Sequence, residues 1–381
     1  MANPPLGLTC SVAGSSAWAF ASDGPERRTN RMAPSPLAGQ VPGALVAKVI
    51  VSLQRALAVE WLAARTRGTR QGCAMKNWHA SEVKPTEWAE AVGLLFAHVP
   101  FPEGNGLARR TLDLLKKGQL PAGGLRVVRS PSGVQGAVLA VPAPGKVGLV
   151  WPPRTIDGPA AAAIEDALLQ DARAWLTGQG IKLCQALLTT SEAEQAHCLV
   201  RNQFRRITGL IYLARRLPIE RRGPAVRPAL SFEPFGAADP ELFAATLEAT
   251  YEETLDFPEL NGIRTRDEVL AGHQAQGNFD PSRWWLVREG ERACGVLLTS
   301  SAAADHSWEV IYMGLVPAAR GRRLGRALLE KAGLEAAQAG ARRLTLCVDE
   351  RNQPARKLYQ ASGFEQVDRR EVFLAILQPP R

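Results

Sequence analysis

The chain has 381 residues, of which 46% are hydrophobic and 22% are charged. This length exceeds one ordinary hydrophobic core, so we expect two domains and an additional segment. No uncharged apolar run reaches the roughly eighteen residues that a membrane helix needs, which argues against an integral membrane protein. The six cysteines show no CxxC or CxxxC pair, so the sequence favours a reducing, cytoplasmic setting over a disulfide framework or a zinc site.

The net charge of +9 is unevenly distributed along the chain. Residues 1–74 carry eight Lys or Arg and three Asp or Glu, so this first fifth holds +5 of the excess. The remainder is nearly balanced, which argues against an extended surface that tracks nucleic-acid phosphates. We therefore expect neither a nucleic-acid partner nor a membrane partner.

The N-terminal segment 1–74 has two open interpretations. Residues 1–42 are rich in Gly, Pro, Ala and Ser without a sustained period and indicate low order. Residues 44–64 have apolar side chains at helical spacing, without the context of a secretory signal. The segment is either a basic, low-order extension or the result of a start codon assigned too early, because Met75 opens a plausible domain.

From Met75 onward the sequence repeats its pattern with an offset of 160 residues, which aligns Phe204 with Phe364. Each copy has the order strand, one or two helices, three strands, helix, strand, helix, strand. This order predicts an α/β architecture in which a mixed sheet is covered by helices. We expect a first lobe at 75–216, a charged, proline-containing linker at 217–229 and a second lobe at 230–378.

The stretch "MGLVPAARGRRLGRALLEKAG" (313–333) joins a predicted strand, Glu309 to Val316, to a predicted helix that begins at Leu324. Pro317 stops the strand, and a turn rich in glycine and arginine follows. Unpaired backbone N–H groups and the helix dipole favour an anion at such a junction. Glycine permits close approach, and arginine suits phosphate.

This junction resembles the pyrophosphate loop of the GNAT superfamily of N-acetyltransferases, whose pattern is [Q/R]-x-x-G-x-[G/A]. It matches neither the P-loop nor the Rossmann fingerprint. Here the loop reads Arg320-Gly321-Arg322-Arg323-Leu324-Gly325. Arg323 departs from the family, which usually has glycine there, and we expect right-handed helical angles at this residue with its side chain away from the diphosphate.

A second segment, "LCVDERNQPARKLYQASGFEQV", resembles the other GNAT signature, N-x-x-A-x-x-[LFY]-Y-x-x-x-G-F. The matching positions are Asn352, Ala355, Tyr359, Gly363 and Phe364. The resemblance covers residues 230–378 and is only topological for the first lobe. It implies an α/β (α+β) fold of two tandem GNAT-like lobes, each with a mixed, mostly antiparallel sheet flanked by helices. This arrangement resembles that of the mycothiol synthases, whose first lobe keeps cofactor-binding features that are absent here.

The resemblance implies an acetyl-CoA-dependent enzyme that acetylates a primary amine of a small molecule or a protein N-terminus by direct attack in a ternary complex. It implies Glu309 as the base that faces the acceptor and Tyr359 as the acid for the leaving thiolate. No metal is expected. The residues implied in cofactor binding are Met313, Gly314, Leu315, Val316, Arg320, Gly321, Arg322, Arg323, Leu324, Gly325, Arg326 and Asn352.

The segment 251–270 is expected to border the acceptor site in this fold. Tyr251, Asp256, Glu259 and Asn261 are its candidate acceptor-binding residues, and the acids and amide suit a cationic or hydroxyl-rich amine. An ordinary polar loop is an equally open interpretation. The sequence leaves the acceptor and the oligomeric state open.

The first lobe lacks the loop pattern and has acids near the corresponding helix start, at Asp157, Glu165 and Asp166. Glu192 and Leu199 occupy the positions that correspond to Asn352 and Tyr359, so we expect this lobe to have lost acetyl-CoA binding. Two alternatives to the enzyme stay open. One is a noncatalytic acyl-CoA-binding sensor or interaction module, and the other is a nucleic-acid-associated protein that uses the basic extension.

Overall fold

The computed structural model describes residues 78–100, 102–218, 230–302 and 306–377. The predicted extension 1–74 and most of the predicted linker 217–229 lie outside the described residues. Among the described helices, none is both long and apolar enough to cross a bilayer.

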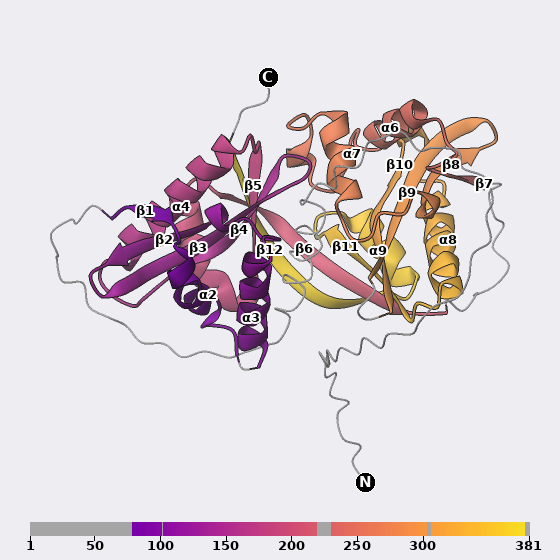
Figure 1. Ribbon diagram of the computed structural model, residues 1–381. Coiled ribbons are helices and arrows are strands. Elements are labelled where there is room, and N and C mark those ends of the chain that lie inside the picture. The colour runs from indigo at the N-terminus through magenta and orange to yellow at the C-terminus, as the bar shows by residue number, and fades with distance from the viewer. Residues whose placement is uncertain (1–77, 101, 219–229, 303–305, 378–381) are drawn as a thin grey trace, which may run out of the picture. The chain divides into compact units, whose positions relative to one another are not determined.

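The first lobe follows the predicted order of elements (Figure 1). Its strands and helices are β1 (Ala80–Glu82), α2 (Trp88–Phe96), α3 (Glu103–Lys116), β2 (Leu125–Ser130), β3 (Gly133–Ala143), β4 (Val147–Thr155), α4 (Ala161–Gly178), β5 (Leu183–Leu188), α5 (Ala196–Arg201) and β6 (Arg205–Arg216).

The second lobe repeats this order, and the aligned residues Phe204 and Phe364 are both buried in front of their lobe's last strand. Its elements are β7 (Leu230–Pro234), α6 (Pro240–Ala249), α7 (Arg266–Gln274), β8 (Trp284–Glu289), β9 (Arg292–Ala302), β10 (Ser307–Leu315), α8 (Leu324–Gln338), β11 (Arg343–Asp349), α9 (Gln353–Ala361) and β12 (Glu365–Ile376).

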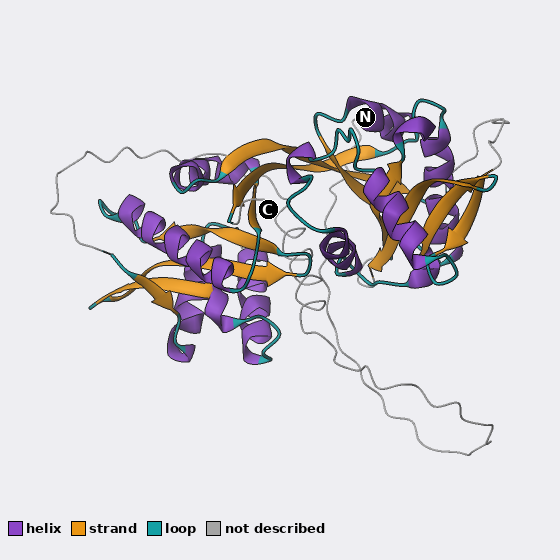
Figure 2. Ribbon diagram, turned by 90° about the horizontal axis from the view of Figure 1, so that it is seen from above, coloured by secondary structure: helices purple, strands orange, loops and turns teal. Residues whose placement is uncertain are grey.

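Helices cover both faces of the sheet in each lobe because the strands are apolar on both faces (Figure 2). In the first lobe, Val127 and Leu139 pack toward α2 and α3, while Val128 and Val138 pack toward α4. In the second lobe, alternate residues of β8 and β9 pack with α8 on one side and α6 on the other. This layered arrangement confirms the predicted fold class.

The strands of the two lobes join in one twelve-stranded sheet with the order β1-β2-β3-β4-β5-β12-β6-β11-β10-β9-β8-β7. The last strand of each lobe pairs with the other lobe: β12 pairs with β5, and β6 pairs with β11. The strands β6 and β12 also pair with each other. The sequence pattern did not reveal this exchange, because it indicates elements and not their partners.

Two strand pairs are parallel, β4 with β5 and β10 with β11, and both are short. In the second lobe the parallel pairing covers only Ser307–Glu309 with Arg343–Thr345. The register of β10 against β9 then shifts between Val310 and Tyr312, as at a β-bulge. Beyond the bulge β10 stays paired with β9 but leaves β11, so its edge there has open backbone groups.

The exchange predicts that the second lobe is not stable by itself. Expressed alone, residues 230–377 lack β5 and β6, so β11 loses one partner strand and β12 loses both of its partners. We expect low soluble yield or a depressed melting temperature for this fragment, and recovery when it is co-expressed with residues 75–216. A fragment that melts at the temperature of the whole chain would contradict the prediction.

Candidate active site

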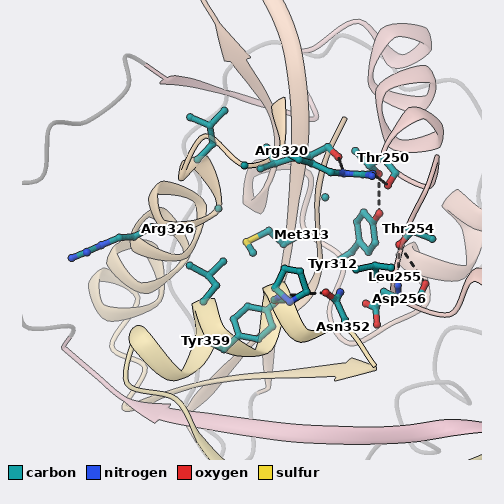
Figure 3. Close-up of a pocket in the computed structure, with 18 of the residues that line it drawn as sticks. Thr250, Thr254, Leu255, Asp256, Tyr312, Met313, Arg320, Arg326, Asn352 and Tyr359 are labelled. Carbon is teal, nitrogen blue, oxygen red and sulfur yellow. Dashed lines mark hydrogen bonds between the residues drawn. The ribbon is translucent and has the colours of Figure 1, made fainter. Parts of the chain in front are cut away.

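A cavity of about 680 Å³ opens where β10 leaves β11 (Figure 3). Its walls are the end of β10, the turn before α8, the beginning of α9 and part of the segment after α6. It brings together ten of the predicted cofactor-binding residues and the predicted acid Tyr359. The ten are Met313, Gly314, Leu315, Arg320, Gly321, Arg323, Leu324, Gly325, Arg326 and Asn352.

The backbone of β10 presents alternate groups to this cavity. Val316 lies outside the cavity lining, and its N–H donates to the Cys294 carbonyl across the sheet. Because successive residues of a strand direct their backbone groups to opposite edges, those of Leu315 and Met313 face the open edge. The backbone of Met313 and the N–H of Leu315 can hydrogen-bond an extended ligand, whereas the Leu315 carbonyl already accepts from Arg320 and the amide of Val316 is used within the sheet.

Gly314 is required by the helix that packs above it. A Cβ at this position would come within 2.7 Å of the Thr250 side chain and of the Tyr312 hydroxyl. Thr250 Oγ1 and Tyr312 Oη are themselves hydrogen-bonded at 2.8 Å. The absence of a side chain at Gly314 therefore lets the end of α6 lie close to β10.

The turn before α8 reaches the helix through left-handed backbone angles. Gly321 has a φ of 73°, and Arg323, the N-cap of α8, has a φ of 62° and a ψ of 14°. The expected right-handed conformation of Arg323 is therefore wrong. This is a position where glycine is favoured, because a side chain in left-handed angles costs about 1–2 kcal/mol.

The arginines of the turn are less available to an anion than the sequence indicated. Arg320 donates to the carbonyl oxygens of Leu315, Thr250, Glu252 and Glu253, and so ties the segment after α6 to the turn.

Two other arginines pair with acids. Arg322 lies outside the cavity and forms a bidentate pair with Glu289 at 2.7 and 2.8 Å. Arg326 bonds Glu330 one helical turn on, at 3.1 Å, and points away from the cavity in Figure 3. The groups left to hold an anion here are mainly the backbone amides at the start of α8, together with the helix dipole.

The α9 signature places Asn352 and Tyr359 on the cavity wall. Asn352 is the N-cap of α9, and its Oδ1 accepts from the Ala355 N–H at 3.2 Å. The predicted glycine and phenylalanine then close the helix, with Gly363 at a φ of 77° and Phe364 buried. Gly325 lets α8 approach α9, because a Cβ there would come within 2.9 Å of Leu358.

Tyr359 is only 7% exposed, although it borders the cavity. Burial is the main cause that raises the pKa of its hydroxyl well above the usual range, and the nearby Asp256 carboxylate adds to the effect. The phenol is therefore protonated at neutral pH. The raised pKa also makes this phenol a weaker acid than a free one, so the predicted role requires that proton transfer to the sulfur accompanies cleavage of the C–S bond.

A second cavity of about 270 Å³ lies in the segment between α6 and α7. Three of the four predicted acceptor residues line it, namely Tyr251, Asp256 and Asn261. Asp256 lines the first cavity as well. Asp256 is therefore a residue that the linings of the two cavities share.

The other predicted acceptor residues have partners in the structure. The Tyr251 hydroxyl shares a hydrogen bond of 2.6 Å with Nε2 of His273, and Asn261 donates to the Tyr251 carbonyl. Burial lowers the pKa of His273 to about 3, so its imidazole is neutral. Glu259 lies outside the cavity lining and accepts two hydrogen bonds from Arg351, at 2.6 and 3.0 Å.

Glu309 is placed apart from both cavities. It pairs with Thr345 in the short parallel contact of β10 and β11 and precedes the bulge, and it is absent from the lining of either cavity.

Three residues that support the site were not predicted from the sequence, namely Asp349, Arg351 and Tyr312. Asp349 and Arg351 lie just before the second signature. They hold the segment after α6 through Phe257 and Glu259, which are distant in sequence.

In the first lobe the corresponding opening between β4 and β5 contains an ion pair. Arg154 Nη2 lies 2.8 Å from Glu192 Oε1, and His98 Nε2 lies 3.2 Å from the same oxygen. Burial tends to raise the pKa of Glu192, but hydrogen bonds from His98 and Thr189 and the charge of Arg154 outweigh it and lower the pKa to about 2. Glu192, which occupies the position in the first lobe that corresponds to Asn352, is therefore ionised and paired with Arg154.

Comparisons with known proteins agree with this geometry. Residues 247–364 match the Acetyltransferase (GNAT) family. The chain is 33% identical over 121 residues to a mycothiol acetyltransferase of Streptomyces scabiei, a match that covers 32% of this chain and 39% of that protein. It is 40% identical over 102 residues to the Beutenbergia cavernae protein of the same name, with 26% and 34% covered. The chain thus spans well under half of the length of these relatives.

Among solved structures, a GCN5-related N-acetyltransferase from Sphaerobacter thermophilus aligns over 81% of this chain and 98% of that chain. The TM-score is 0.54 and the identity is 18%, so this likeness shows the fold. The fold, the open strand edge and the α9 signature of the second lobe agree with the family match. Over residues 247–364 the second lobe is therefore similar to the GNAT acetyltransferases, and this similarity implies the use of acetyl-CoA.

The left-handed angles of Arg323 predict that Arg323→Gly stabilises the protein by up to about 1 kcal/mol. Relief of about 1–2 kcal/mol of strain outweighs the roughly 0.5–1 kcal/mol of extra backbone entropy that glycine loses on folding. Arg326→Gly, within right-handed α8, is the matched control and should lose about 1 kcal/mol. Urea denaturation measures both variants, and equal losses would contradict the assignment.

The internal ion pair of the first lobe predicts that one chain binds one molecule of acetyl-CoA. Calorimetric titration of the full chain should give a stoichiometry near one. Two sites of similar affinity would show that the pair formed by Arg154 and Glu192 does not prevent binding in the first lobe.

Proposed function

We propose that this protein transfers the acetyl group of acetyl-CoA to a primary amine by direct attack in a ternary complex. The observation that carries the proposal is that two cavities share Asp256 in their linings, one of them bordered by an open strand edge, a helix N-terminus and a protonated phenol. This arrangement suits a thioester in the larger cavity and an amine in the smaller one.

The larger cavity has groups that suit two parts of acetyl-CoA, the diphosphate and the pantetheine arm. The turn from Gly321 to Leu324 offers backbone N–H groups to the diphosphate. The exposed edge of β10 offers the backbone of Met313 and the N–H of Leu315 to the pantetheine arm. When bound, acetyl-CoA supplies an acyl carbon that is activated by a thiolate leaving group.

Tyr359 has the role of general acid. The amine forms a C–N bond to the acyl carbon, the C–S bond breaks, and the phenol gives its proton to the departing sulfur. Tyr359 is available for this step because it is neutral and borders the cavity. The proton lost by the amine needs a separate acceptor on the protein.

The size and lining of the smaller cavity suit a small acceptor amine or the N-terminus of a peptide. Its volume of about 270 Å³ lies at the low end of ligand sites. Apolar side chains from Leu247, Leu260 and Val269 share its wall with Glu248 and Arg264. Such a lining suits an amine with a short apolar part, either in a small molecule or at a protein N-terminus.

The decisive experiment measures thiol release from acetyl-CoA over a panel of amines, including amino sugars, cysteinyl sugar conjugates and short peptides. We expect turnover with at least one of them. Acetyl-CoA binding without turnover on the whole panel would instead support a noncatalytic sensor.

Tyr359→Phe is expected to lower kcat by about 10²–10⁴-fold, because the phenylalanine retains the ring and removes the proton donor. The dissociation constant of acetyl-CoA should change less than about threefold. Tyr212→Phe, on β6 outside both cavities, is the matched control and should retain activity. Equal rates for the wild type and Tyr359→Phe would exclude the acid role.

A further inference from the structure

We infer that Asp256, rather than Glu309, is the general base that removes the proton from the acceptor amine. This inference rests on the proposed function and adds a residue that acts on the reacting atoms. Asp256 lines both cavities, whereas Glu309 lines neither. Figure 3 shows Asp256 on the cavity wall together with Asn352 and Tyr359.

The carboxylate of Asp256 is held in one orientation by the neighbouring strand. Its Oδ1 accepts from the Asp349 N–H at 2.9 Å, and its own N–H donates to Thr254 Oγ1 at 3.1 Å. Within the described part of the chain no donor reaches its other oxygen, Oδ2. One oxygen is thus fixed, and the other is free to accept a proton.

The segment around Asp256 is held to the end of β11 by hydrogen bonds and ion pairs. The Phe257 N–H donates to Oδ2 of Asp349, which is fully buried. Arg351 bonds both Asp349 and Glu259 and so links the strand to the segment. Phe257 has a φ of 49°, which is unfavourable for an aromatic residue. Strained backbone that is maintained by several contacts is typical of functional sites.

The charged and titratable groups near Asp256 decide its protonation, and they come from several parts of the second lobe. Burial has the largest effect and raises its pKa to about 6; the Asp349 amide lowers it, the Asp349 charge raises it and Arg351 lowers it. The phenols around it also have pKa values raised by burial, so they are neutral at pH 7. These groups are Asp349, Arg351, Tyr251, Tyr312 and Tyr359.

A buried aspartate with a pKa of about 6 is suited to accept the proton of the acceptor amine during acetyl transfer. At pH 7 it is about nine-tenths ionised, yet it is a stronger base than an aspartate in water. As the amine nitrogen bonds to the acyl carbon it becomes acidic, and its proton passes to Oδ2 of Asp256. The thiolate takes the phenol proton of Tyr359, and exchange with solvent then restores both groups.

The test compares the pH dependence of kcat at saturating amine for the wild type and three variants: Asp256→Asn, Glu309→Gln and Asp267→Asn. This quantity reports the groups of the enzyme–substrate complex, and for the wild type we expect it to fall about tenfold per pH unit below about pH 6. Asp256→Asn should lower kcat by about 10²–10³-fold and remove this acidic limb. Glu309→Gln should keep the limb, and so should Asp267→Asn, which alters an exposed aspartate on α7.

A stability measurement separates a base from a residue that only holds the loop. Because the pKa of Asp256 is raised on folding, the folded state retains this proton as the pH rises from about 4 to 6, and the protein loses stability over that range. Asp256→Asn removes this penalty, so its melting temperature at pH 7 should equal or exceed that of the wild type. A purely structural role predicts a lower one.

The outcomes distinguish this inference from the proposed function. If the wild type acetylates an amine but Asp256→Asn retains its rate and its acidic limb, only the inference fails. Loss of the limb in Glu309→Gln would also overturn it. If the wild type acetylates no amine of the panel, the proposed function fails and the inference fails with it.

Discussion

The site depends on one constraint in the sheet, the short parallel contact between β10 and β11. Three residues of each strand pair, and a bulge then turns β10 away. Without the bulge, β11 would occupy the edge that is open to a ligand. The glycine at 314, the helix α6 above it and the turn into α8 all follow from the direction that β10 takes at this point.

Backbone requirements explain why some features could be predicted from the sequence. The strand end, Pro317, the glycine turn and the helix from Leu324 depend on neighbouring residues, and the structure has all of them. The order of elements in both lobes follows similarly from local patterns. Arg323 is different, because the family preference for glycine indicates a left-handed angle that the arginine side chain alone did not reveal.

The side-chain contacts of the site were harder to predict, because they depend on segments that are distant in sequence. Four arginines near a turn indicated phosphate binding, but Arg320 instead holds the segment after α6, and Arg322 pairs with Glu289 from β8. Asp256 was expected to bind the acceptor. Its position between two cavities follows from Asp349 and Arg351, about ninety residues further on. No spacing rule connects such groups.

The exchanged strands β6 and β12 also restrict how the protein can move. Strand pairing continues from β5 through β12 and β6 to β11, with two register shifts between β12 and β6. A hinge motion between the lobes would have to break a ladder of backbone hydrogen bonds, so it is an unfavourable route for substrates to come and go. The segment from Tyr251 to Ile263 is joined to the rest of the second lobe in another way, mainly by side-chain contacts such as those of Arg320 and Arg351.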